Sequence, residues 1–454
     1  MRARLRDPYW LAIAAGAAAW MAFALVAAPN AGGTDAYIFK AAGCNLALGG
    51  GFTAAALPGA GDAAPHLFAA YAPGLPFLFG AFASVFGCSG ATNTWFDLLV
   101  AAGATIAVAA VLRDRLAPSL RVTCAALLGA TLPGGFVSTA SDRPEALALA
   151  GIVAACAAAR RDSARAAGGS RHAWTAPLLA GATALVHPFG GALALLAVWM
   201  IRVTRDATPA RDATRAPDPR AGPVREAAAL AVPFAIPLVT VAGICIAADP
   251  GSPARFAGHA FGAGLGLGAM ATARWTDLLR HAFVSAGVDS LCLAGGFVAV
   301  AATVVAWLAA GIRSTTDARS GIAFGTIVGA AAIPLVAFPA QNNYYGLARA
   351  AIVVMVACTD APLVARPRRA TVLGAAAIVS CLAMFPMLGL TALTRAESRA
   401  GYASAVRAAA AFADSVAARR ADGVVLVPAT HFFVYRPFVA SLVNPGYLDP
   451  SPAA

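Results

Sequence analysis

Apolar stretches of about 18 residues or more recur along the whole of this 454-residue chain. Each is long enough to cross the hydrocarbon core of a bilayer, which is about 30 Å thick. Sixty per cent of the residues are hydrophobic and only 12% are charged, whereas a soluble domain carries about a quarter charged residues on its wetted surface. The pattern therefore predicts an all-α polytopic membrane protein.

We predict about eleven transmembrane spans, two of which are short and meet at a tight turn, His187-Pro188. Residues 74–87 are ambiguous, because their apolar side chains have helical spacing but the segment reaches only about 21 Å. It is either a short span or an interfacial helix. The predicted spans are residues 10–28, 92–112, 121–139, 144–159, 174–187, 188–201, 226–248, 287–311, 320–339, 346–364 and 370–393.

The basic residues separate these two interpretations. If 74–87 lies on the membrane surface, 21 of the 33 lysines and arginines fall in one set of loops. If it spanned, the later basic clusters would lie across the membrane from the N-terminal one, against the positive-inside rule. We therefore expect an interfacial helix and a cytoplasmic N-terminus. The net charge of +12 is explained by topology, and no nucleic-acid partner is expected.

Three extracytoplasmic pieces follow from this threading. The first is the loop 29–91, with helices expected at 35–48 and 74–87, and the second is the glycine-rich segment 249–286. The third is the region 394–454, which reads as a small α/β tail beyond a transmembrane region of residues 1–393, with a helix at 397–420 followed by a strand. The LVAAPNA stretch after the first span resembles a signal-peptidase site. We expect the first helix to be retained, since it keeps the later spans in phase with the charges.

Six of the eight cysteines fall in or beside apolar runs, where a thiol behaves as a small hydrophobic group. Cys44 and Cys88 differ, because both lie in the first outer loop. An oxidising compartment would permit a disulfide between them, but the interpretation preferred from sequence is two unpaired thiols. No CxxC pair or His/Cys spacing typical of a metal site occurs.

Acidic residues at the outer ends of spans are the first candidates for chemistry, because ionisable groups there are costly. Asp35 follows the first span and begins a short helix, where it could take a proton from an acceptor hydroxyl. Asp142 and Glu145 lie in a short outer loop, three residues apart. All three also suit helix starts, where acids cap the chain and complement the dipole. Both interpretations can hold at once.

Cationic and polar candidates for binding a phosphate are fewer. Lys40 lies five residues after Asp35, and Arg349 stands at the outer start of the tenth span. An arginine can hold a phosphate with two hydrogen bonds, but Arg349 could equally extend to the lipid headgroups. His187 is more typical of a turn residue with a satisfied hydrogen bond than of a ligand. His66, in the first loop, could contact an acceptor or a donor.

The order of these features resembles the GT-C membrane glycosyltransferases, and in particular the branch of protein O-mannosyltransferases and bacterial aminoarabinose transferases. The resemblance rests on an early acid in the first loop, with His187 standing where those families carry a permanent cation, and it covers roughly residues 10–201. The matching stretches are Asp35-Ala36-Tyr37, residues 72–87, residues 143–160 and residues 178–199.

This resemblance implies an inverting transfer of a sugar from a polyprenyl-phosphate donor to a lipid, glycan or protein acceptor, at the outer face of a bacterial inner membrane. Asp35 would be the general base, and Asp142 or Glu145 would hold the acceptor or steady the transition state. Lys40 and Arg349 would neutralise the departing phosphate, so that no metal or cofactor is required. The alternatives are a transporter or flippase and a catalytically degenerate assembly subunit.

Overall fold

The structure is a computed structural model of the chain. It describes residues 7–26, 34–55, 65–68, 71–137, 143–166, 174–205, 221–254, 318–337, 342–359, 366–382, 403–412, 414–415, 425–426 and 442–443. Its labelled helices are α1 (Pro8–Val26), α2 (Thr34–Ala47), α3 (Gly74–Phe86), α4 (Gly90–Leu112), α5 (Pro118–Val137), α6 (Glu145–Ala166), α7 (Thr175–Val186), α8 (Pro188–Arg205), α9 (Ala221–Ala248), α13 (Ala318–Ala337), α14 (Asn342–Cys358) and α15 (Arg366–Leu382).

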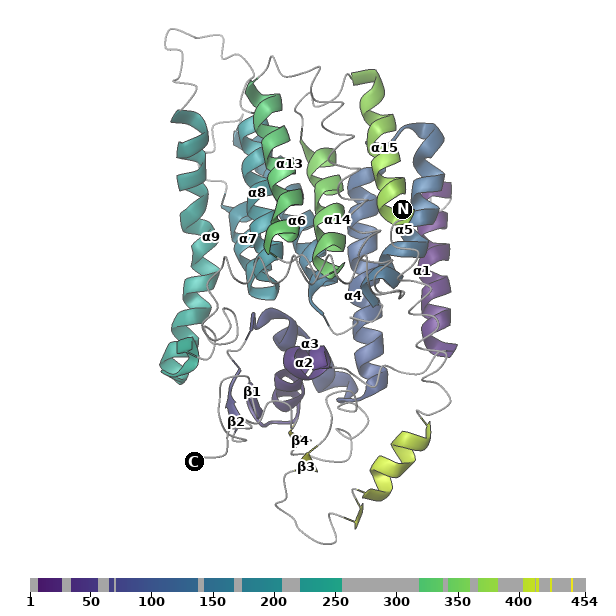
Figure 1. The fold of residues 1–454 in the computed structure, drawn as a ribbon, viewed down its shortest axis with the longest axis vertical. Coiled ribbons are helices and arrows are strands. Elements are labelled where there is room, and N and C mark those ends of the chain that lie inside the picture. Colours follow the sequence, from purple (N-terminus) through teal and green to yellow (C-terminus); the bar gives the residue numbers. More distant parts are fainter. Residues whose placement is uncertain are drawn as a thin grey trace.

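The long helices form one bundle in which they run side by side, while α2 and α3 lie together across one end of it (Figure 1). A large apolar core runs through the bundle, with α6 in contact with α4, α7, α8 and α14. On one side α1 packs against α5, where a side chain at Gly16 would collide with the backbone of Gly129. Small residues at such crossings let helix backbones approach closely.

The predicted spans agree with the helices of the bundle wherever the structure describes them. Residues 287–311 lie outside the described residues, and each of the other ten predicted spans overlaps a helix. Within the part of the chain that the structure describes, two helices are long and apolar enough to cross a membrane, namely Gly90–Leu112 and Glu226–Ala248. The second has only 11% of its apolar window buried, which distinguishes it from the core helix of a soluble protein. The other apolar helices are shorter, so the total of eleven spans stays a prediction.

Residues 29–91 contain both helices expected from their sequence. The predicted 35–48 and 74–87 correspond to α2 and α3, which pack against each other through Gly43 and Gly80. A Cβ at Gly43 would collide with the carbonyl oxygen of Pro76, so this crossing requires glycine. On its other face α3 leaves Phe77, Val85 and Phe86 exposed by 59%, 74% and 62%. Such an apolar face suits a helix lying on a membrane surface.

The structure corrects the preference for unpaired thiols in this loop. Cys44 in α2 and Cys88 before α4 form a disulfide, with their Cα atoms 5.7 Å apart. The two cysteines are 44 residues apart in the chain. Their contact depends on how α2 crosses α3, so it could not be predicted from the sequence. Five further cysteines in the described residues form no disulfide, and most are buried in the bundle.

Short strands also occur in this loop and in the tail. β1 (Thr53–Ala55) pairs antiparallel with β2 (Pro65–Leu67). The rings of Phe52 and Phe68 pack edge-on beside this pair, with their centroids 5.7 Å apart. The sequence analysis did not predict this pair. In the tail, a helix at Ala403–Phe412 falls within the predicted 397–420, and β3 (Val425–Leu426) pairs parallel with β4 (Leu442–Val443). These tail elements lie toward the same end of the bundle as α2 and α3 (Figure 1).

The opposite end of the bundle is fastened by polar contacts between α1 and α4. Arg113 donates to Asp7 at 2.5 and 3.0 Å, and the Tyr9 hydroxyl donates to the carbonyl of Ala109 at 2.7 Å. The guanidinium of Arg113 holds the pKa of Asp7 below its usual value. The carboxylate therefore stays ionised, and the pair stays formed, at neutral pH.

The disulfide predicts a difference in thiol labelling. In protein purified without reductant and then unfolded, reduction should make two more cysteines, Cys44 and Cys88, reactive toward maleimide. A double Cys44→Ser, Cys88→Ser variant should show no such gain and should lose about 2–4 kcal/mol of stability, because its unfolded loop is unconstrained. Labelling of the wild type that does not change on reduction would contradict the pairing.

Candidate functional site

Lys40, the only lysine in the chain, is fully buried where α2 meets α4. Its ammonium donates to Oδ1 of Asp97 at 2.6 Å and to Oδ1 of Asn93, and it lies over the rings of Phe79 and Phe96 at 5.3 and 5.6 Å. Removing one partner of a buried ion pair leaves an uncompensated charge and is strongly destabilising. Lys40 therefore fixes α2 against α4.

This geometry bears on the phosphate-binding role expected for Lys40. Its ammonium is enclosed by Asp97, Asn93 and two aromatic rings. The contacts indicate a structural anchor, because a carboxylate at 2.6 Å already neutralises the charge. Sequence reasoning missed Asn93 and Asp97. The available signal was that Asp97 is the only charged residue in the predicted span 92–112, and such a residue needs a partner.

A second polar cluster lies at the start of α6 and at the turn between α7 and α8. Glu145 is buried and accepts a hydrogen bond from Nε of Arg143 at 2.9 Å. His187 is also buried, and its Nδ1 accepts the backbone N–H of Gly190 at 3.1 Å. A neutral His187 therefore carries its proton on Nε2, which lies 3.8 Å from Oε1 of Glu145. The expected turn role of His187 is present, and the contact with Glu145 is additional.

Aromatic rings connect this cluster to α2. Tyr71 packs edge-on against Phe39 of α2, with ring centroids 4.8 Å apart, and against His187, with centroids 6.4 Å apart. Gly74 at the start of α3 approaches the carbonyl of Leu185 at the end of α7. The polar cluster at Glu145 and the helix pair α2/α3 thus meet at one end of the bundle. Arg143 and Tyr71 are two members of this site that the sequence analysis did not select.

Arg349 is the third feature, and it lies inside the bundle. The residue is only 6% exposed, and among the described residues its Nε and Nη1 have no hydrogen-bond partner. It stands seven residues into α14, about 10 Å along the helix axis. Burial of this kind excludes the simple extension to lipid headgroups that was one interpretation of the sequence. A buried cation without a partner is costly and marks a candidate anion site.

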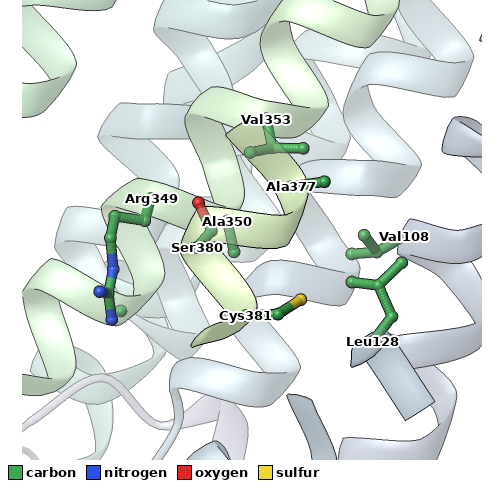
Figure 2. Close-up of a pocket in the computed structure, with 9 residues that line it drawn as sticks. Val108, Leu128, Arg349, Ala350, Val353, Ala377, Ser380 and Cys381 are labelled. Carbon is green, nitrogen blue, oxygen red and sulfur yellow. The ribbon is translucent and has the colours of Figure 1, made fainter. Parts of the chain in front are cut away.

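A small hollow lies beside Arg349, between α4, α5, α14 and α15 (Figure 2). Its volume of about 20 Å³ admits little more than one water molecule. Val108, Leu128 and Cys381 face one another across it, whereas the guanidinium of Arg349 points away from Ser380 and Cys381. The hollow therefore does not supply the missing partner of the arginine.

Three of the predicted site residues fall partly or wholly outside the description. Asp142 lies outside the described residues, and His66 is described only as the middle residue of β2. Asp35 is the second residue of α2, and its side chain is likewise outside the description. Among the residues that the structure describes, no group of three or more His, Cys, Asp or Glu side chains could hold a metal ion.

Comparison with known proteins adds no relative. No family model, no curated protein and no solved structure matches the chain.

Removing one partner of the buried ion pair should destabilise the protein more than replacing both partners. Asp97→Ala should destabilise the protein by about 3–5 kcal/mol, because it leaves the ammonium of Lys40 buried without its carboxylate. The double variant Lys40→Met, Asp97→Leu should recover most of that loss, as measured by thermal unfolding in detergent. Asp114→Asn, at a carboxylate that is 78% exposed, is the control and should change stability by less than about 0.5 kcal/mol. Equal effects of Asp97→Ala and Asp114→Asn would refute the anchor.

Proposed function

We propose that this chain is a GT-C-type membrane glycosyltransferase, which moves a sugar from a polyprenyl-phosphate donor to an acceptor hydroxyl outside the cytoplasm. The observation that carries the proposal is the position of α2. Its second residue is Asp35, one turn before Phe39 on the same helix face. Phe39 contacts Tyr71, which contacts His187 beside Glu145. The candidate base therefore begins a helix that is fixed next to a buried cluster of charged residues.

The proposed threading has eleven spans with the N-terminus in the cytoplasm. The Cys44–Cys88 disulfide supports it, because disulfides persist on the oxidising side of a membrane. That disulfide lies in the helix pair at one end of the bundle, whereas Arg113, Arg115 and Arg160 lie at the other ends of α4 and α6. Basic residues favour the cytoplasmic side, so both signals agree on the orientation.

In the proposed reaction, Asp35 accepts the proton of the acceptor hydroxyl while the hydroxyl oxygen forms a bond to the anomeric carbon of the donor. The bond from that carbon to the phosphate oxygen breaks, and the polyprenyl phosphate leaves with the electron pair. Arg349 is the cation proposed to stabilise the negative charge on the leaving group. Arg143 is already paired with Glu145 through a 2.9 Å hydrogen bond, and this pair helps to hold the buried cluster in place.

A transporter or flippase remains the second candidate, and one observation favours it. Arg349 is buried within the bundle, where transporters place the groups that bind an anion in transit. Counterflow of a labelled substrate into proteoliposomes that contain no lipid-linked donor distinguishes the two functions. Transport under those conditions, with no glycan transfer, would show that the chain is a transporter and not a glycosyltransferase.

The transferase proposal predicts that Asp35→Asn abolishes sugar transfer. Loss of a general base lowers the rate by about 10²- to 10⁴-fold, while the isosteric amide leaves insertion and folding intact. Transfer is measured with purified protein and a panel of labelled polyprenyl-phosphate sugars. Asp7→Asn, at an acid on the opposite end of the bundle, should retain full activity. A fully active Asp35→Asn variant would exclude the mechanism.

Replacing Arg349 should weaken donor binding without lowering the stability of the protein. Arg349→Met removes a buried cation that has no described partner, so the variant should be at least as stable as the wild type. If the arginine binds the donor phosphate, the KM for the lipid-linked sugar should rise by about 10- to 100-fold. Arg349→Lys keeps the positive charge but cannot form two parallel hydrogen bonds to the phosphate. Its donor KM should therefore lie between those of the wild type and Arg349→Met. An unchanged donor KM in Arg349→Met would remove Arg349 from the site.

A further inference from the structure

A second hollow, of about 500 Å³, opens at the arginine-rich end of the bundle. It lies where α4, α6 and α14 meet, three helices in mutual contact (Figure 1). Its volume falls within the range of sites that hold small molecules, which is about 300–1,000 Å³. None of the residues proposed for sugar transfer lines it, so it is a separate feature of the molecule.

The lining of this hollow is apolar on one side and charged on the other. The apolar wall consists of Ala110, Val111 and Ala157, and the basic groups are those of Arg115 and Arg160. The apolar span of α4 ends at Leu112, between Val111 and Arg115. In the proposed threading, the hollow therefore lies at the level where the hydrocarbon core gives way to the lipid headgroups.

Two further arginines at this end of the bundle contact helix ends. Arg113 binds Asp7, and Arg369 donates to the carbonyls of Val356 and Thr359, which lie at the C-terminal end of α14. The one acid in the lining, Asp114, is mostly exposed and lies 3.5 Å from Arg113. With two arginines and one acid in its lining, the hollow has a net basic character beside its apolar wall.

We infer that this hollow binds the phosphate headgroup of an anionic phospholipid from the cytoplasmic leaflet. Arginine guanidinium groups match phosphate oxygens in shape and charge, and basic pockets between membrane helices on the cytoplasmic side bind such headgroups. Arg115 and Arg160 bind the phosphate, while Val111 and Ala157 contact the first carbons of the acyl chains. The site depends on the proposed orientation, and it is independent of sugar transfer.

The test uses the full chain, purified in detergent and stripped of lipid. Phosphatidylglycerol, phosphatidylcholine and sodium phosphate are titrated separately, with the thermal unfolding midpoint and native mass spectrometry as measurements. The variants are Arg115→Gln, Arg160→Gln and the double substitution. Arg161→Gln is the matched control, because Arg161 is the next residue of the same helix, is exposed and does not line the hollow.

Phosphatidylglycerol should raise the unfolding midpoint of the wild type and remain bound in the mass spectrometer, whereas phosphatidylcholine should not. Each lining variant should weaken phosphatidylglycerol binding by about fivefold and the double variant by about thirtyfold, while Arg161→Gln should match the wild type. Asp35→Asn should bind the lipid normally, which separates this result from the fate of the transferase proposal.

Three results would overturn the inference. Equal stabilisation of the wild type by both lipids would show that charge is not recognised. Equal weakening by Arg160→Gln and Arg161→Gln would reduce the effect to general surface electrostatics. Stabilisation by sodium phosphate as strong as that by phosphatidylglycerol, and equally dependent on Arg160, would assign the hollow to a soluble anion. The comparison of lipids on the wild type stands even where a variant does not fold.

Discussion

The ion pair between Lys40 and Asp97 is the contact on which the arrangement of the α2/α3 end of the bundle depends. An ammonium group that is fully buried requires a carboxylate, and α4 supplies it together with Asn93 one turn away. Cys44 lies one turn after Lys40 along α2 and bonds to Cys88, just before α4 begins. Two contacts of different chemistry therefore fasten the same face of α2 to the same neighbour.

This double attachment has a consequence for the proposed chemistry. A general base must be held within hydrogen-bond reach of the proton that it removes, and loops position side chains less precisely than rigid elements do. Asp35 lies in the first turn of α2, five residues before Lys40. Its backbone is held through Lys40 and through the contact of Phe39 with Tyr71. The helix would therefore give Asp35 a stable position in the proposed reaction.

The two ends of the bundle differ in how they treat charge. At the α2/α3 end, Arg143, Glu145 and His187 lie close together, and both Glu145 and His187 are buried away from water. At the other end, arginines hold helix ends and a salt bridge at the surface, and they line an open hollow. Counting arginines by loop is enough to orient a chain, but it assigns every arginine the same role. The structure distinguishes Arg113, which is paired with Asp7, from Arg160, which lines the hollow.

Helix positions could be predicted from the sequence by itself, because each apolar run must satisfy its own backbone hydrogen bonds as a helix. The predicted 35–48 differs from α2 by one residue at each end, and the predicted 74–87 differs from α3 by one residue at its C-terminal end. Periodicity and charge are local properties, and they determined these elements and the candidate acids. The tertiary structure alone decided the pairing of Cys44 with Cys88, the burial of Lys40 against Asp97, the short β1–β2 pair and the enclosure of Arg349. Each joins residues that are far apart in the chain or on different helices, and such contacts depend on how the helices cross, which no local pattern of residues records.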